Sequence, residues 1–243
     1  INNREFVVHY QPIIELSSGK IVGEEALTRW PQPDGSSLSP DIFVPLAEQT
    51  GLISQLTHLV IEKVFEDMGY WLHLHAGQHI SINLAPADLT SGKLPPLLSH
   101  LMNKWKVHPQ QIALELTERG FADPKISAPA IAAFRHSGHA IYIDDFGTGY
   151  SSLSYLQDLD VDTLKIDKAF VDALEYKNVT PHIIEMAKSL KLAMVAEGVE
   201  TEGQLAWLRR HGVQYGQGWY YSKALPKADF ILWAEDNLKT HPT

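Results

Sequence analysis

Apolar residues fall along the chain in two alternating patterns. Short segments rich in β-branched and aromatic residues, typical of strands, alternate with longer segments whose apolar positions recur at helical spacing. The strand-like segments are 6–16, 21–30, 79–84, 112–117, 140–144, 163–166, 193–197 and 213–217. The helix-like segments are 41–49, 56–74, 94–105, 124–137, 181–190 and 202–211. This alternation predicts an α/β fold with a mainly parallel sheet.

The first two strands are expected to be an exception to the parallel arrangement. Only a short turn around Ser17, Ser18 and Gly19 separates them, whereas a parallel crossover needs about a dozen residues, so this pair should be antiparallel. Eight strands in a chain of 243 residues favour a closed (β/α) barrel over an open sheet. No linker or change in composition divides the sequence, and residues 1–243 are therefore expected to form a single domain.

Composition and charge narrow the class of protein. Apolar residues make up 44% and charged residues 20% of the chain, which is ordinary globular usage and excludes a disordered or fibrous protein. The chain has no cysteine, which excludes disulfides and thiolate metal sites. A net charge of -9, from 29 acidic residues against 20 Lys and Arg, argues against a broad basic face for duplex nucleic acid.

The chain begins at Ile1, with neither a start methionine nor a secretory leader. This start predicts a domain cut from a longer, multidomain signalling protein, with regulatory or sensor domains elsewhere in the full-length chain. The longest segment free of Asp, Glu, Lys and Arg, residues 68–87, holds several histidines and is too polar to span a membrane. We therefore expect a cytoplasmic domain, and leave membrane anchoring of the parent protein open.

Reactive side chains gather where the predicted strands end, and barrel enzymes place their catalytic groups at those ends. Alternation along the strands puts Asn83 and Glu115 on the face opposite their apolar neighbours. The polar side chains expected at this mouth are Glu25, Asn83, Glu115, Asp144, Asp145, Lys165 and Glu197.

Five of these side chains are carboxylates, and such crowding is unstable unless protons or cations neutralise it. An all-oxygen ligand set favours a hard cation, Mg²⁺, Mn²⁺ or Ca²⁺, over zinc. More than four carboxylates favour two ions, and the adjacent Asp144 and Asp145 could bridge them.

Ordered motifs along the sequence resemble those of the EAL-domain cyclic-di-GMP phosphodiesterases. Residues Glu25-Ala26-Leu27-Thr28-Arg29 are similar to the signature that names this family. The other matching motifs are Tyr10-Gln11-Pro12, Ile82-Asn83-Leu84, Glu115-Leu116-Thr117-Glu118, residues 144–153, Lys165-Ile166-Asp167, Glu197-Gly198-Val199-Glu200-Thr201 and Gln217-Gly218. The resemblance extends to Leu225-Pro226 and so covers nearly the whole chain.

This resemblance implies a modified TIM (β/α)8 barrel whose first strand runs antiparallel. It implies a phosphodiesterase that hydrolyses cyclic di-GMP to linear pGpG and so lowers the level of this bacterial second messenger. It also implies two divalent cations, Mg²⁺ or Mn²⁺, while Ca²⁺ is expected to bind without supporting turnover. By motif position, the first ion would be held by Glu25, Asn83, Glu115 and Asp144, and the second by Asp144, Asp145 and Glu197.

The same resemblance assigns further roles. Lys165 would contact the attacking water, and Glu118 would position the loop 146–152. Of the neighbouring pair Glu197 and Glu200, Glu197 is the preferred metal ligand because it ends a strand, and Glu200 remains a second catalytic candidate. A homodimer formed near the loop 146–152 is also expected. The expected substrate contacts are Gln11, Arg29, Asp167 and Gln217.

Two other functions fit part of the pattern. A barrel of this family could bind cyclic di-GMP without cutting it and pass the signal to a partner, although such members typically lack a metal ligand and this chain has all of them. A barrel glycosidase could use Glu115 and Glu197, since two carboxylates suffice for that chemistry. A glycosidase would leave without a role Asn83, Asp144, Asp145 and Lys165, and its activity would survive removal of metal by EDTA.

Overall fold

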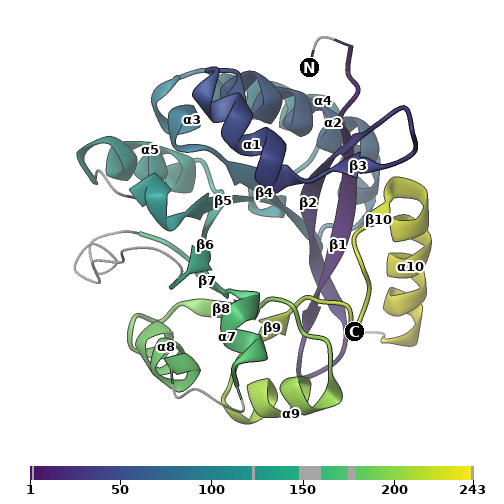
Figure 1. Cartoon of the computed structure of the whole chain (residues 1–243), viewed down its shortest axis with the longest axis vertical. Helices are drawn as coiled ribbons and strands as arrows, with labels where there is room; N and C mark the ends of the chain where they lie inside the picture. Colours follow the sequence, from purple (N-terminus) through teal and green to yellow (C-terminus); the bar gives the residue numbers. More distant parts are fainter. Residues whose placement is uncertain (2, 122–123, 148–159, 175–178, 242–243) are drawn as a thin grey trace.

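The computed structural model describes residues 1, 3–121, 124–147, 160–174 and 179–241 (Figure 1). Its central feature is a ring of strands that closes because β1 pairs with both β2 and β9. β1 is antiparallel to both of these neighbours, and the other adjacent pairs in the ring are parallel. The ring consists of β1 (Val7–Glu15), β2 (Ile21–Pro31), β4 (His79–Leu84), β5 (Ile112–Thr117), β6 (Ala140–Phe146), β7 (Thr163–Ile166), β8 (Ala193–Ala196) and β9 (Tyr215–Gly216). The predicted closed α/β barrel with an inverted first strand is confirmed.

Helices surround the barrel on its outer face (Figure 1). They are α1 (Pro40–Gln49), α2 (Ile53–Leu74), α3 (Pro86–Thr90), α4 (Leu94–Trp105), α5 (Pro124–His136), α7 (Lys168–Asp172), α8 (Val179–Ser189), α9 (Glu202–Arg210) and α10 (Lys227–Thr240). The short 3₁₀ turns η1 (Pro109–Gln111) and η2 (Glu118–Phe121) and the two-residue strands β3 (Ser37–Leu38) and β10 (Leu225–Pro226) complete the described elements.

The main core lies between the barrel and these helices. Ile80, Ile82, Leu114 and Leu164 point outward from their strands and are fully buried beneath the helices. Because side chains alternate along a strand, the residues between them face the barrel axis. This alternation leaves the inward positions near the strand ends free for the polar side chains of the site.

The carboxyl-terminal helix α10 was not expected from the sequence, nor was the short strand β10 before it. Among the described residues of α10, only Phe230 and Ala234 are fully buried, so its apolar stripe is narrow. Phe230 packs on Tyr10 of β1 with ring centroids 5.8 Å apart. Figure 1 shows α10 beside β1, where the inverted hairpin provides no crossover helix of its own.

Among the residues that the structure describes, no helix is both long and apolar enough to cross a bilayer.

Glu24 on β2 is a buried carboxyl group that faces away from the barrel axis. The residue is fully buried, and neither carboxylate oxygen has a hydrogen-bond partner in the described part of the chain. Burial raises the pKa of Glu24 well above its usual value, because the charged form loses its hydration. The folded state therefore holds the proton on Glu24 to a higher pH than the unfolded chain does.

We predict that Glu24→Met stabilises the fold by about 1–3 kcal/mol near pH 8, because it removes an unpaired buried polar group at similar volume. A raised folded-state pKa gives stability that is present below the unfolded pKa of about 4.3 and lost as pH rises, so the gain should be smaller at pH 5. Urea unfolding of the parent protein and of Glu24→Met at pH 5 and pH 8 measures this gain in stability. A variant less stable than the parent at pH 8 would contradict this reading, and Glu24→Gln, which keeps a polar group, is the control.

Candidate functional site

Lys165 on β7 lies at the centre of an acidic cluster at the carboxyl ends of the parallel strands. Its side chain is 1% exposed, and its ammonium group contacts carboxylates from four different strands or strand ends. The distances from Lys165 Nζ are 3.2 Å to Glu25, 2.7 Å to Glu115, 3.0 Å to Asp144 and 2.8 Å to Glu197. One lysine ammonium group therefore contacts four carboxylates that lie far apart in the sequence.

The carboxylates form two overlapping groups with the spacing of metal ligands. Glu25, Glu115 and Asp144 each offer an oxygen within 4.8 Å of the others, and so do Asp144, Asp145 and Glu197. Asp144 belongs to both groups. The structure thus brings together all five carboxylates that the sequence analysis placed at this mouth.

A local irregularity in β6 brings Asp144 and Asp145 to the same side. In a regular strand, adjacent side chains point to opposite faces. Here the pairing of β6 with β7 shifts register between Ile143 and Phe146, and Asp145 takes a left-handed conformation with φ of 54°. Such a bulge re-aims a side chain, and Asp accepts this conformation more readily than most residues.

Two amides hold Glu25 in place within the cluster. Asn83 on β4 donates a hydrogen bond of 2.9 Å to Glu25 Oε1. Gln217, directly after β9, donates bonds of 2.6 Å to Glu25 Oε2 and 3.0 Å to Glu197 Oε1. Sequence reasoning assigned Gln217 only to the substrate and did not find this link between two carboxylates, although the inward alternation of β9 could have indicated it.

The electrostatics of the cluster show a large excess of negative charge. Burial raises the pKa of Glu115 well above its usual value, and burial raises that of Glu197 to about 8 and that of Asp145 to about 6. Burial would lower the pKa of Lys165, but the surrounding carboxylates raise it well above its usual value. When all groups are ionised, five carboxylates and one ammonium leave four negative charges uncompensated.

This donor set fits divalent cations. The Oε1 atom of Glu115 is buried and has no hydrogen-bond partner in the described ranges of the chain, so it is available as a ligand. The cluster offers only carboxylate and amide oxygens, which suit hard cations. Two divalent ions would balance the four uncompensated charges. The acidic cluster can therefore hold metal.

The remaining sequence-predicted residues surround the cluster. Glu118 accepts a hydrogen bond of 2.6 Å from the backbone amide of Gly147, where the loop after β6 begins. Gln11 on β1 lies opposite Glu25 in the hairpin and donates to the Ser222 carbonyl at 3.1 Å. Asp167 caps the amino end of α7 by accepting from Ala169 N at 2.8 Å. Residues 148–152 of the predicted loop lie outside the described residues.

Arg29 and Glu200 are not part of the carboxylate cluster around Lys165. Arg29 is half-buried on β2 and donates to its neighbour's carbonyl, Thr28 O, at 2.9 Å. Glu200 is exposed and pairs with Lys168 at 2.7 Å instead of Lys165. The chain turns at Gly198, which has φ of 64°, and a Cβ there would lie 2.4 Å from the Lys168 side chain. The structure thus brings Glu197, but not Glu200, to the cluster.

The fold and this site define a closed α/β barrel with an acidic mouth suited to divalent cations. Residues 1–224 match the family model of the EAL domain. The chain belongs to the EAL domain family.

Curated relatives agree with this membership. Over 238 residues, covering 98% of the chain, the sequence is 71% identical to "Probable cyclic di-GMP phosphodiesterase PdeB" of Escherichia coli (strain K12). It is 35% identical over 96% of the chain to "Probable cyclic di-GMP phosphodiesterase PdeN" of the same strain. The chain spans 46% of the length of each of these two relatives.

Solved structures share the fold. A structure titled "PaMucR Phosphodiesterase, c-di-GMP complex" is 35% identical and superposes with a TM-score of 0.88 over 94% of this chain and 95% of that one. "Structure of EAL Enzyme Bd1971 - cAMP and cyclic-di-GMP bound form" is 32% identical, with a TM-score of 0.90 over 96% of this chain and 65% of that one.

We predict that Mn²⁺ stabilises this protein through the acidic cluster. A ligand at 100 times its dissociation constant stabilises a fold by about 2.7 kcal/mol, which for a chain of this size raises the melting temperature by roughly 5–10 °C. Differential scanning calorimetry with and without Mn²⁺ measures the shift.

In the same experiment, Asp144→Asn should lose most of the shift, because Asp144 serves both carboxylate groups. The matched control is Asp172→Asn, which removes an exposed carboxylate that pairs with Lys168 outside the cluster. A full shift in Asp144→Asn would show that Mn²⁺ binds elsewhere.

Proposed function

We propose that this chain is the catalytic domain of a phosphodiesterase that hydrolyses cyclic di-GMP to linear pGpG. The observation that carries the proposal is the pair of carboxylate groups that share Asp144 around the buried Lys165. The printed names of the relatives and the cyclic-di-GMP complexes of the structural neighbours support this choice of substrate.

In the proposed reaction, a water oxygen bonds to phosphorus and the bond from phosphorus to one 3′ oxygen breaks. Two divalent cations, Mg²⁺ or Mn²⁺, would lower the pKa of the water and offset charge on the phosphoryl oxygens. The first would be held by Glu25, Asn83, Glu115 and Asp144, and the second by Asp144, Asp145 and Glu197.

Lys165 would donate a hydrogen bond to the attacking water and keep the cluster together while negative charge develops. Its burial among four carboxylates fixes the position of the ammonium group, and a fixed donor needs no reorganisation during the reaction. Glu118 would hold the loop after β6 through Gly147. The side chains that would bind the substrate are Gln11, Arg29, Asp167 and Gln217.

The two alternative functions make different predictions. A cyclic-di-GMP sensor would bind the nucleotide and leave it intact, even though both carboxylate groups are complete here. A glycosidase would use only Glu115 and Glu197, yet both contact the same ammonium group, and membership of the EAL domain family gives no support to that chemistry.

We predict that the purified protein with Mn²⁺ converts cyclic di-GMP to pGpG, as followed by ion-pair chromatography, and that EDTA stops the reaction. Activity should return when Mn²⁺ is added in excess. Binding of cyclic di-GMP without any pGpG would contradict the proposal and favour a sensor.

Two matched variants sharpen this test. Glu197→Gln should lower kcat by about 10³-fold or more, because Glu197 would hold an ion that stabilises the transition state. Glu200→Gln should retain more than about a tenth of the activity, because Glu200 pairs with Lys168 at the edge of the site. The reverse order of the two losses would show that Glu200 is the ligand.

We also propose that the domain forms a homodimer near the loop 146–152, and that the full-length protein carries regulatory or sensor domains. The multidomain length of the relatives supports the second point. Light scattering at working concentration tests the first and should give twice the monomer mass of 27.2 kDa. A mass of one chain would contradict it.

A further inference from the structure

A cavity lies inside the barrel at the amino-terminal ends of the parallel strands, opposite the acidic mouth. Its volume is about 380 Å³, and its walls include His79, Tyr142, Thr163, Ala193 and Tyr215. These residues begin β4, β7, β8 and β9 or lie near the start of β6. The volume equals that of about a dozen water molecules and falls within the range of small-molecule sites.

This cavity lies one layer of side chains below the acidic cluster. Tyr142 precedes Asp144 by two residues, Thr163 precedes Lys165, and Tyr215 precedes Gln217 in the same way. Because side chains repeat every two residues on one face of a strand, these three wall residues point into the barrel directly beneath Asp144, Lys165 and Gln217. The cavity therefore opens at the other end of the barrel and does not overlap the acidic site.

The polar groups on one wall form a connected chain. Tyr142 Oη lies 2.9 Å from His79 Nε2, and Tyr142 also shares a hydrogen bond with the Thr163 side chain. The other side of the His79 ring bonds to the Val22 backbone. Burial lowers the pKa of His79 to about 4, so its ring is neutral at pH 7. This wall is thus rigid, aromatic and uncharged.

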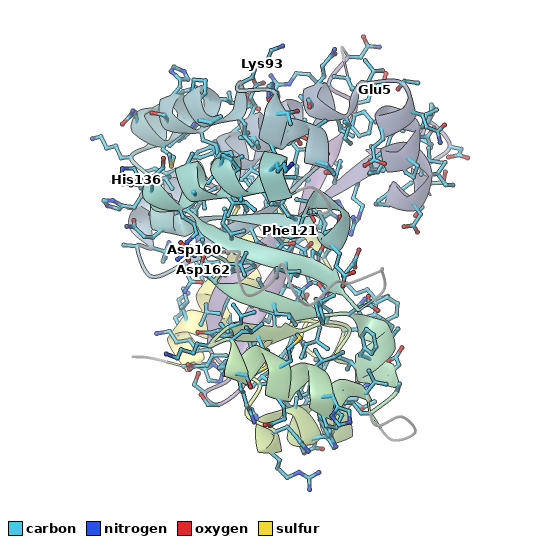
Figure 2. All side chains as sticks on the ribbon, turned by 90° about the vertical axis from the view of Figure 1, so that its left-hand side faces the viewer. Glu5, Lys93, Phe121, His136, Asp160 and Asp162 are labelled. Atoms are coloured by element: carbon cyan, nitrogen blue, oxygen red, sulfur yellow. The ribbon has the colours of Figure 1, made fainter. Side chains whose placement is uncertain are left out.

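The acidic residue on the cavity wall already has a cationic partner. Asp162 pairs with Arg135 of α5 and accepts a hydrogen bond of 2.8 Å from the Ile141 amide. Arg135 also pairs with Asp160 at 2.7 Å. Figure 2 shows Asp160 and Asp162 next to each other, below His136. An anionic ligand would find no free cationic partner among the described lining residues.

Tyr215 provides a free hydroxyl at this cavity. Its side chain is half-buried, and its hydroxyl makes no hydrogen bond to any residue that the structure describes. Two tyrosine rings and one imidazole among the lining residues favour contact with a flat ring, and the Tyr215 hydroxyl can bond to a polar atom on that ring.

We propose that the barrel has a second ligand site in this cavity, which binds an uncharged, planar ring molecule of about ten non-hydrogen atoms with a hydrogen-bonding group. Shape selects the flat ring, the lack of a free cationic group among the described lining residues disfavours anions, and the Tyr215 hydroxyl orients the polar end. The site is independent of the acidic cluster and of the reaction proposed there.

The test uses 4-fluorophenol as the probe and follows its fluorine NMR signal as the intact protein is added. We expect saturable broadening with a dissociation constant on the order of 1 mM, as suits a ligand of this size. Ala193→Phe fills the cavity and should abolish the effect. Ala206→Phe, at an exposed position on α9, is the matched control and should leave it unchanged.

A second variant covers the case in which Ala193→Phe does not fold. Tyr215→Phe keeps the ring and removes only the hydroxyl, so we expect affinity for 4-fluorophenol to fall about 3- to 10-fold. Three results would overturn the proposal: no saturable signal with the parent protein, equal binding by folded Ala193→Phe, or equal binding by Tyr215→Phe. Addition of EDTA should not change the binding, which separates this site from the metal cluster.

Discussion

The contact between Lys165 and four carboxylates determines how the rest of this structure must be arranged. Each partner comes from a different strand or strand end, so the ammonium group can be satisfied only when the ring of strands is closed. A lone buried lysine would cost several kcal/mol, and so would each lone buried carboxylate. The cluster is therefore a long-range constraint on the register of the barrel as well as its chemical centre.

Stability and function oppose one another at this mouth. Five carboxylates surround one ammonium group and repel each other. Burial raises the pKa of Glu115 and Glu197, and this repulsion raises it further. The hydrophobic layer between strands and helices, with residues such as Ile82 and Leu164 fully buried, provides the free energy that offsets this repulsion. Divalent ions would remove the repulsion and couple metal binding to the stability of the fold.

Much of this arrangement follows from the sequence. Alternating apolar positions predict the strands, and the same alternation places Glu115 and Lys165 toward the barrel axis. Three features depend on tertiary context that a linear pattern does not contain. The left-handed Asp145 depends on a bulge between β6 and β7, and α10 depends on the face that β1 leaves uncovered. Glu24 is buried without a hydrogen-bond partner among the described residues, although its side chain is polar.

The central claim is that Asp144 is shared by two adjacent sites for divalent cations. An anomalous difference map of crystals grown with Mn²⁺, recorded at the manganese absorption edge, tests it most directly. The account predicts two peaks, one among Glu25, Glu115 and Asp144 and one among Asp144, Asp145 and Glu197. A map without any peak at Asp144, with the carboxylates still bound to Lys165, would contradict it.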